Sequence, residues 1–174
     1  SALTGAQRPI AILGLDLLEV SDRAALQAFV EHFGIPFVTT YKAKGIVPES
    51  HPLCLGAAGL SPLADGHLLP LFARADVVLA IGYDPIEMRS GWRDPWSPET
   101  QMVIDISSVE NTHYMHQASL HFRADIPATL DSLASGTAPA QVWPDNAPDA
   151  ARKALGAAFD RSEPWGPAAI IDEA

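Results

Sequence analysis

Cysteine is nearly absent from this sequence: Cys54 is the only one in 174 residues, so no disulfide can close within the chain. The sequence also lacks an apolar run long enough to span a bilayer and an apolar leader that could direct export. Positive charge is scarce, with 11 Lys and Arg against 21 Asp and Glu and a formal net charge of -10. Since nucleic acid and anionic membranes are bound through clustered positive charge, neither is expected as a partner. A cytoplasmic protein is the simplest expectation.

The composition is that of a folded domain. Hydrophobic residues make up 48% of the chain and charged residues 18%, which is enough to bury a core. The chain begins with SALTGAQRP, without an initiating Met, and stops in GPAAIIDEA, where Pro167 suits the first turn of a helix. We therefore expect a piece of a longer polypeptide, which could lack the residues that perform its parent's chemistry.

Apolar runs alternate with helical patterns along the chain. The helix expected over residues 21–34 has Ser21 or Asp22 as its N-cap and Gly34 as its C-terminal stop. A second helix starts at Ser61, and its expected buried face contains Leu63, Leu68, Leu69, Leu71 and Phe72. Strands are expected over residues 10–13, 36–40, 75–82, 101–106 and 119–125, and further helices over residues 125–133 and 149–160.

The strands are apolar throughout rather than alternately polar, which is typical of parallel strands covered on both faces. With helices between them, they predict an α/β fold: a doubly wound, mostly parallel sheet of about five or six strands with helices on both faces, of the Rossmann-like, nucleotide-binding type. We expect linking or added residues over 1–8, the α/β domain over 9–134, and a linker, a docking helix and the approach to a further domain over 135–174. Residues 41–61 are expected to form a long loop.

In such a sheet, ligands bind beyond the carboxyl ends of the strands, where the strand order reverses. Four segments are expected to converge there, namely residues 14–16, 39–44, 82–84 and 105–107. Glycine lets a backbone approach a ligand closely, but tight turns and packing require glycine equally. Both interpretations stay open for Gly14, Gly56, Gly59 and Gly82.

Three acidic residues near these segments have alternative roles. Asp105 ends an apolar run, where its carboxylate could bind a ribose or could cap the turn over residues 107–111. Asp84 and Glu87 flank Pro85, and we expect them to be solvated turn residues rather than an acid pair.

Several familiar sites are not supported by the sequence. The first turn, GLDLLE, lacks two glycines of G-x-G-x-x-G, and no P-loop or G-x-S-x-G occurs. His113 and His116 lie three apart, yet no set of three or four metal ligands is recognisable. Cys54 is expected to be a small core residue. Trp92 and Trp96 are expected to pack a long loop onto the domain, with an aromatic wall for a ligand or partner as the alternative.

Five segments together resemble a known family. RPIAILG, FGIPFVTTYKAKGIVPESHPLCLGAAG, ADVVLAIGYDPIE, MVIDIS and FRADIPATLDSLA resemble, in order and spacing, the central domain of thiamine-diphosphate-dependent enzymes of the acetolactate synthase and 2-oxoacid decarboxylase group. The resemblance spans residues 8–134. Its most distinctive pattern is T-x-x-x-K-G-x-x-P-E-x-H-P-x-x-x-G, matched by Thr40, Lys44, Gly45, Pro48, Glu49, His51, Pro52 and Gly56.

The resemblance implies a polypeptide of three similar domains. Thiamine diphosphate and magnesium would be bound between the first and third domains, usually across two subunits of a homo-oligomer. The central domain would contain no catalytic residue and no metal ligand, and the other two domains would be its partners. The cofactor motif of the third domain, G-D-G followed by N, is not found in this chain, because Asp65 follows Ala64.

In some relatives the central domain binds FAD or ADP, and in others the site is empty. By position, the residues facing such a ligand would be Gly14, Leu15, Gly56, Gly59, Gly82, Tyr83, Asp105 and Ile106, with Asp125 near the adenine. Flavin-binding synthases have an R-F-D-D-R type segment where this sequence has YDPIEMR. GYDPIE is more similar to the flavin-free acetolactate synthases, which disfavours a bound flavin.

Three functional hypotheses follow. The leading one is a noncatalytic central domain that joins and spaces the catalytic domains of an enzyme acting on 2-oxoacids. The second is a working FAD- or ADP-binding domain of such an enzyme. The third, a free-standing NAD-dependent deacylase with the same sheet architecture, is disfavoured because a four-cysteine zinc module and a G-A-G-x-S loop are missing.

Overall fold

The computed structural model describes residues 2–110, 114–159, 165–166 and 169–170. Within them, one sheet contains the strands β1 (Pro9–Leu13), β2 (Phe37–Thr40), β3 (Cys54–Ala58), β4 (Val77–Ile81), β5 (Met102–Ser107) and β6 (Leu120–Arg123). The α-helices are α1 (Arg23–Phe33), α2 (Pro62–Arg74), α3 (Ile126–Ala134) and α4 (Ala147–Ala158), and shorter 3-10 turns are η1 (Leu15–Glu19), η2 (Pro85–Glu87) and η3 (Ser90–Trp92). The helix expected to begin at Pro167 lies outside the described residues.

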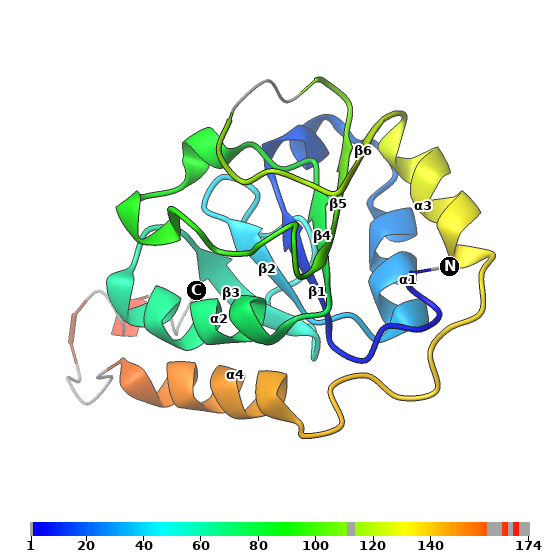
Figure 1. Cartoon of the computed structure of the whole chain (residues 1–174). Helices are drawn as coiled ribbons and strands as arrows, with labels where there is room; N and C mark the ends of the chain where they lie inside the picture. Colours follow the sequence, from blue (N-terminus) through cyan, green and yellow to red (C-terminus); the bar gives the residue numbers. More distant parts are fainter. Residues whose placement is uncertain (1, 111–113, 160–164, 167–168, 171–174) are drawn as a thin grey trace.

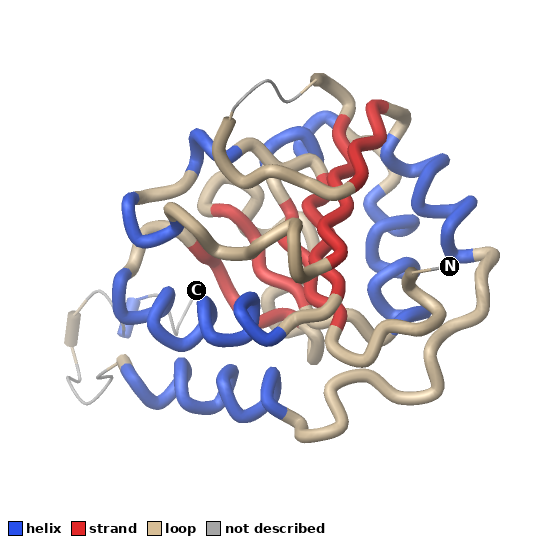
Figure 2. The backbone as a smooth tube through the Cα atoms, in the orientation of Figure 1, coloured by secondary structure: helices blue, strands red, loops and turns tan. Residues whose placement is uncertain are grey.

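The six strands are all parallel, in the order β3-β2-β1-β4-β5-β6. Helices α1 and α3 cover one face, and α2 and α4 lie on the other (Figure 1). Figure 2 shows the strands stacked between these two helical layers. The predicted doubly wound α/β fold is confirmed, because a sheet covered on both faces requires strands that are apolar on both sides. Both β1 and β4 are buried along their whole length.

Helix ends follow the expected local chemistry. The Asp22 carboxylate accepts hydrogen bonds from the N–H groups of Ala24 and Ala25 at 3.1 and 3.2 Å, and Gly34 ends α1 in the left-handed conformation at φ 63°. At α2, the Ser61 hydroxyl accepts from the Ala64 N–H at 3.3 Å. These caps confirm the predicted starts of both helices.

Two local predictions are wrong. The segment over residues 41–61, expected to be a long loop, contains strand β3. Its sequence CLGAA has little strand propensity, and it forms through pairing with β2 and contact with α2 and α4. Leu63, expected on the buried face of α2, is 48% exposed. Asp65 is buried there instead, because its carboxylate accepts the Gly59 N–H at 2.8 Å.

Loops replace helices between β4 and β5 on the α2 face. In the described residues this crossover contains only η2 and η3, and two tryptophans occupy the space that a helix would fill. Trp92 is fully buried and Trp96 is 8% exposed. The Trp92 ring lies 5.1 Å from the Phe72 ring, and the Trp96 ring 5.8 Å from the Tyr83 ring, centroid to centroid. The predicted packing role of both tryptophans is confirmed.

Residues 135–146, which we call the strap, run from α3 beneath the sheet to α4 (Figure 1). The Trp143 indole N–H donates to the Pro9 carbonyl at 2.7 Å, and its backbone N–H donates to the Gln7 carbonyl at 2.7 Å. Helix α4 then packs against α2 and β3, as expected for a docking helix. It covers the β3 edge of the sheet, whereas all four residues of β6 at the other edge are exposed.

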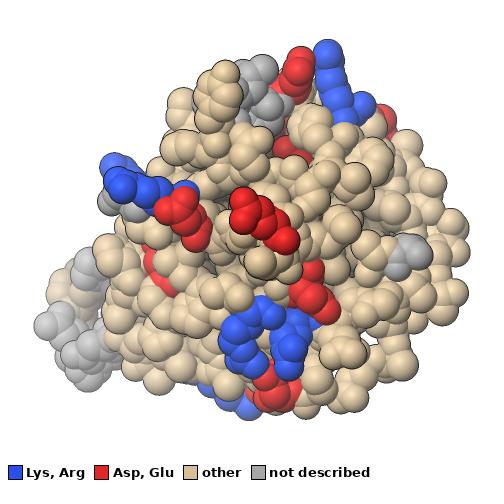
Figure 3. Space-filling model, in the orientation of Figure 1, with Lys and Arg blue, Asp and Glu red and all other residues tan. Residues whose placement is uncertain are grey.

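Charged side chains on the face seen in Figure 3 form small groups of both signs. Among the described residues, no helix has the length and apolar character needed to cross a membrane.

Candidate functional site at the carboxyl edge of the sheet

The strand order reverses between β1 and β4, so the crevice expected to hold a ligand lies beyond the ends of these two strands. Gly14 and Gly82 follow them directly. A Cβ atom on Gly14 would lie 2.4 Å from both the Gly82 oxygen and the Tyr83 Cα. The Asp16 N–H also donates to the Gly82 carbonyl at 3.0 Å. The two turns therefore touch each other through backbone atoms at the position predicted for a ligand.

The other two predicted glycines also contact parts of this chain. Gly59, at φ 94°, has Met88 against it: a Cβ there would lie 2.2 Å from the Met88 sulfur, and the Gly59 carbonyl accepts the Arg89 N–H at 3.2 Å. Gly56, at φ 103°, lies on β3, where a Cβ would contact a Leu155 methyl of α4 at 3.7 Å. The contact at Gly59 and the positive φ of both residues give them turn and packing duties, which is one of the two interpretations open from the sequence.

Leu15, another predicted site residue, donates its backbone N–H to the Glu87 carboxylate at 3.2 Å. Burial raises the pKa of Glu87, while the Thr40 side chain and the Leu15 N–H favour the charged form and limit the rise. The second carboxylate oxygen, Oε1, is buried without a hydrogen bond among the described residues. The expectation that Glu87 is a solvated turn residue is therefore wrong. Asp84, by contrast, caps η2 by accepting the Ile86 N–H at 2.9 Å.

Neutralising Glu87 is expected to stabilise the domain. Because the folded pKa lies above the ordinary value of 4.5, the folded state carries an unfavourable charge once the pH exceeds that folded pKa. Glu87→Gln keeps an acceptor for the Leu15 N–H and removes the charge, so its Tm should exceed that of the unaltered chain at about pH 7 and approach it at about pH 4. Asp84→Asn removes the same charge from the same turn and only relieves its repulsion of Glu87, so it should give a smaller gain; an equal gain would contradict the burial explanation.

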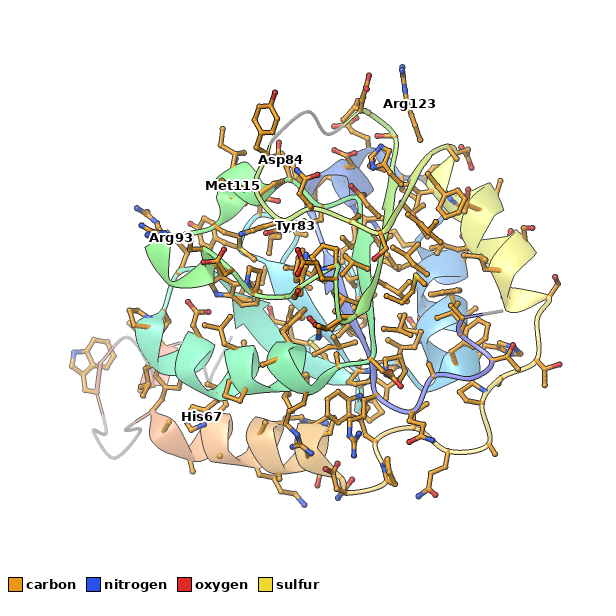
Figure 4. The ribbon with its side chains drawn as sticks, viewed as in Figure 1. His67, Tyr83, Asp84, Arg93, Met115 and Arg123 are labelled. Carbon is orange, nitrogen blue, oxygen red and sulfur yellow. The ribbon has the colours of Figure 1, made fainter. Side chains whose placement is uncertain are left out.

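Tyr83 is buried beneath the loops that follow β4 and β5 (Figure 4). Its hydroxyl lies 2.6 Å from His116 Nδ1, and His116 Nε2 lies within hydrogen-bond distance of the Trp92 carbonyl oxygen. A carbonyl only accepts, so Nε2 carries the proton and Nδ1 accepts from the tyrosine. Burial raises the pKa of Tyr83 well above its ordinary value and lowers the pKa of His116. Both groups are therefore neutral at about pH 7 and bonded within the chain.

Acid is expected to weaken this network. The folded pKa of His116 lies below the ordinary value of 6.5, so the unfolded chain takes up a proton first as the pH falls below 6.5, and stability declines until the folded pKa is reached. The midpoint of urea unfolding should fall between about pH 7.5 and about pH 5.5 by more in the unaltered chain than in His116→Asn. Asparagine tolerates the φ of 54° found at this position. Equal slopes in the two proteins would show that another group causes the loss.

Asp105 and Ile106 point to opposite faces of the sheet. Ile106 is fully buried in the core under α1 and α3. Asp105 pairs in register with His121 of β6, and its carboxylate lies 3.0 Å from His121 Nδ1. Burial raises the pKa of Asp105, while the nearby His121 partly opposes this rise. Asp105 Oδ1 is buried without a hydrogen bond among the described residues. Asp105 does not cap the following turn at Ser108, because the Ser108 N–H donates instead to an Asp16 carboxylate oxygen at 3.3 Å.

Asp125 caps α3, because its carboxylate accepts the Ala128 N–H at 2.9 Å. The distinctive loop between β2 and β3 is held by its own polar residues and by Glu31 of α1. Lys44 pairs with Glu49, and His51 Nε2 lies 2.9 Å from the Glu31 carboxylate on α1. The Leu53 N–H donates to His51 Nδ1 at 3.2 Å, so Nε2 is the protonated nitrogen. These pairs stabilise the loop, while Thr40 at the start of the motif bonds Glu87 beside the crevice.

The described residues offer no set of ligands for the magnesium ion that accompanies thiamine diphosphate in the family. In that part of the chain, no group of three or more His, Cys, Asp or Glu side chains could hold a metal ion. His113, considered with His116 from the sequence, lies outside the described residues. Cys54 is buried as predicted, and burial raises the pKa of its thiol.

Sequence reasoning did not single out His121 as the partner of Asp105, because no local pattern marks a contact between separate strands.

A parallel sheet with this strand order, reversing between β1 and β4, defines an α/β domain of the nucleotide-binding architectural type. The family described as "Thiamine pyrophosphate enzyme, central domain" matches residues 1–133, and the chain belongs to this family. The resemblance found in the sequence is thereby confirmed.

Two curated relatives and one solved structure illustrate the similarity. The chain is 33% identical over 86 residues to 2-hydroxyacyl-CoA lyase 1 of Homo sapiens, covering 49% of this chain and 15% of the relative. It is 31% identical over 106 residues to the acetolactate synthase large subunit of Corynebacterium glutamicum, covering 60% and 17%. An X-ray structure from Mycobacterium smegmatis, assigned to the thiamin diphosphate-dependent enzymes, shares the fold with a TM-score of 0.62 and 19% identity, over 82% of this chain and 27% of that chain. This chain spans less than a fifth of the length of the two curated relatives.

Proposed function

We propose that this chain is the noncatalytic central domain of a thiamine-diphosphate-dependent enzyme acting on 2-oxoacids, either acetolactate synthase-like or a decarboxylase. Its role is to join and space catalytic domains and to stabilise a homo-oligomer in the cytoplasm. The observation that carries this proposal is the contact between the turns after β1 and β4, where backbone and side chains of the chain itself occupy the crevice. The family membership supports it.

The catalytic part of the proposal is tested with the purified chain. Incubated with thiamine diphosphate, magnesium and pyruvate, the chain is expected to release no carbon dioxide, because the cofactor is bound by the other two domains of the parent. A matched incubation with a complete acetolactate synthase provides the positive control. Turnover by this chain above the rate without protein would overturn the proposal.

We further propose that the nucleotide site of the family is vestigial in this chain. The Leu15 N–H, which in such a sheet would be free for a phosphate, is bound to the Glu87 carboxylate, and Gly59 is covered by Met88. Calorimetry with FAD, ADP and CoA is expected to show no binding at about 1 mM ligand. Saturable heat with FAD or ADP would favour the second candidate, a working nucleotide-binding domain, for which the unpaired and buried Asp105 Oδ1 is the supporting observation.

The domain boundaries are part of the same proposal. The α/β domain over residues 9–134 would act as one unit, and residues 135–174 would carry the strap, α4 and the approach to the next domain of the parent. The contacts of Trp143 with residues before and within β1 support a strap that is fixed to the domain rather than a free linker.

A further inference from the structure

Strand β6 is the last strand of the sheet, and one side of its backbone has no neighbouring strand among the described residues. The Ala124 N–H donates to the Ser107 carbonyl at 3.0 Å, so residue 124 turns its backbone toward β5. Successive residues of a strand turn their backbone N–H and C=O groups to opposite sides, so residues 120 and 122 also face β5. The backbone groups of His121 and Arg123 therefore point away from the sheet, where they can pair with another strand.

These outward groups match those of a second copy of the same strand. In an antiparallel pair, two opposite residues exchange two hydrogen bonds when both turn their backbone toward the partner. A two-fold axis at Phe122 places His121 of each copy opposite Arg123 of the other, so the outward groups of both residues are bonded. An axis at His121 would instead need the Ser119 N–H, which already donates to the Val103 carbonyl at 2.8 Å.

The same register covers the apolar side chains of β6. Phe122 is 46% exposed and Leu120 is 44% exposed, so the sheet and α3 cover only about half of each. On the axis, Phe122 meets the second copy's Phe122 in a non-hydrogen-bonded position, where Cα atoms lie about 4.5 Å apart and side chains approach most closely. Leu120 faces the second copy's Ala124. The apolar parts of the strand thus lie opposite apolar parts of its copy.

The distribution of charge also favours a second copy at this surface. The net charge is -10, so two copies repel each other over most of their surface. The segment over residues 114–142, which contains β6 and α3, has few charges, and its only Lys, Arg, Asp or Glu residues are Arg123, Asp125 and Asp131. Depletion of charge is the usual mark of an interface core. In the register above, Arg123 faces His121, whose ring is bonded to the Asp105 carboxylate at 3.0 Å, so negative charge lies near the guanidinium.

We propose that two copies of this chain associate by antiparallel pairing of their β6 strands about a two-fold axis at Phe122, which joins the two sheets into one. Because β6 has only four residues, the contact is smaller than a standard interface and the dimer is weak, with a Kd of about 10–500 µM. The proposal names a surface for the homo-oligomer of the proposed function, and it rests on that function only for its role in the parent enzyme.

Two measurements on the unaltered 174-residue chain test the proposal. Sedimentation velocity is expected to show a shift from monomer to dimer between about 5 and about 500 µM chain. Hydrogen exchange of the His121 and Arg123 amides, followed by ¹H–¹⁵N NMR, is expected to slow at least about twofold between about 20 and about 500 µM, because these N–H groups gain partners only in the dimer. A chain that stays monomeric at about 500 µM overturns the proposal, and so does a dimer in which both amides exchange at an unchanged rate.

A substitution on the axis locates the interface. Phe122→Glu places two negative charges opposite each other and should weaken dimerisation at least about tenfold. Ile86→Glu is the matched control, since it adds the same charge at a side chain that is 67% exposed on η2 and should weaken dimerisation less than about twofold. Undiminished dimerisation of Phe122→Glu, or an equal loss in Ile86→Glu, overturns the proposal.

A second pair of variants tests the backbone contact. Arg123→Pro removes the outward N–H without breaking the ladder to β5, and its ring occupies the position that the second strand needs. Arg123→Ala loses the same charge but keeps the N–H, so it should dimerise more tightly than the proline variant. The urea midpoint reports whether each variant folds. If Phe122→Glu does not fold, this pair decides, and equal dimerisation of the two Arg123 variants overturns the proposal. Turnover is not measured in these assays, so a failure here is distinct from release of carbon dioxide by the chain, which alone overturns the noncatalytic role.

Discussion

Replacing Gly14 with alanine is expected to destabilise the domain by about 3 kcal/mol or more, measured by urea unfolding. The new methyl group would lie 2.4 Å from the Gly82 oxygen and the Tyr83 Cα, which are backbone atoms that cannot rotate away. These atoms are fixed, because the Gly14 N–H donates to Ile81 at 2.9 Å and the Gly82 N–H to Ile106 at 2.7 Å. Relief of the clash therefore requires separating the ends of β1 and β4.

Gly66→Ala provides the matched control. Gly66 lies within α2, and nothing stands within 4 Å of its Cβ position. Alanine is the better helix former, so this variant should gain about 0.5–1 kcal/mol. If Gly14→Ala were as stable as the unaltered chain, the two turns could not be in the contact described above.

The second large effect is expected for Trp92→Ala, which should cost about 3–5 kcal/mol in the free energy of unfolding. Trp92 is fully buried and packs edge-on against Phe72 of α2. Since loops cover this face between β4 and β5, no helix can close over the cavity that the substitution leaves. The midpoint of urea unfolding should fall with an unchanged slope.

Trp165→Ala is the control for this second prediction. The Trp165 side chain is 80% exposed, so its removal should change stability by less than about 0.5 kcal/mol. A loss at position 165 as large as that at position 92 would mean that the tryptophan packing has been assigned to the wrong residue.

The layers of the fold were predictable because local signals agree with the tertiary structure. The runs that became β1 and β4 are apolar on both sides, and only a sheet covered on both faces can bury them. The caps Asp22 and Ser61 satisfy backbone N–H groups at positions that the sequence marks.

The wrong predictions concern residues whose state depends on distant parts of the chain. Strand β3 has weak strand propensity and depends on β2 and α4 for its formation. The local sequence of Glu87 predicts a solvated turn residue, whereas its carboxylate bonds the N–H of Leu15, 72 positions earlier in the sequence. The Asp105 to His121 contact likewise depends on strand register, which no local pattern specifies.

The sequence indicates where the candidate site lies, but not which atoms lie against its glycines. Glycine at positions 14, 59 and 82 indicates that something approaches the backbone closely, and strand order indicates where. A glycine is selected by the closeness of a neighbour and not by its identity, so the sequence allowed a ligand or protein at each position. The neighbours are Tyr83, Met88 and Leu17, all supplied by other turns of the same chain.

The two edges of the sheet differ, and this limits how molecules can associate. The exposed edge strand β6 has unpaired backbone groups that could join a second sheet, although it is only four residues long and Arg123 projects away from it (Figure 4). The opposite edge is blocked by α4. Two molecules joined through β6 therefore form a closed pair with no free edge for a third. Truncation before α4 would uncover the second edge and turn a self-limiting contact into one that can propagate as a polymer.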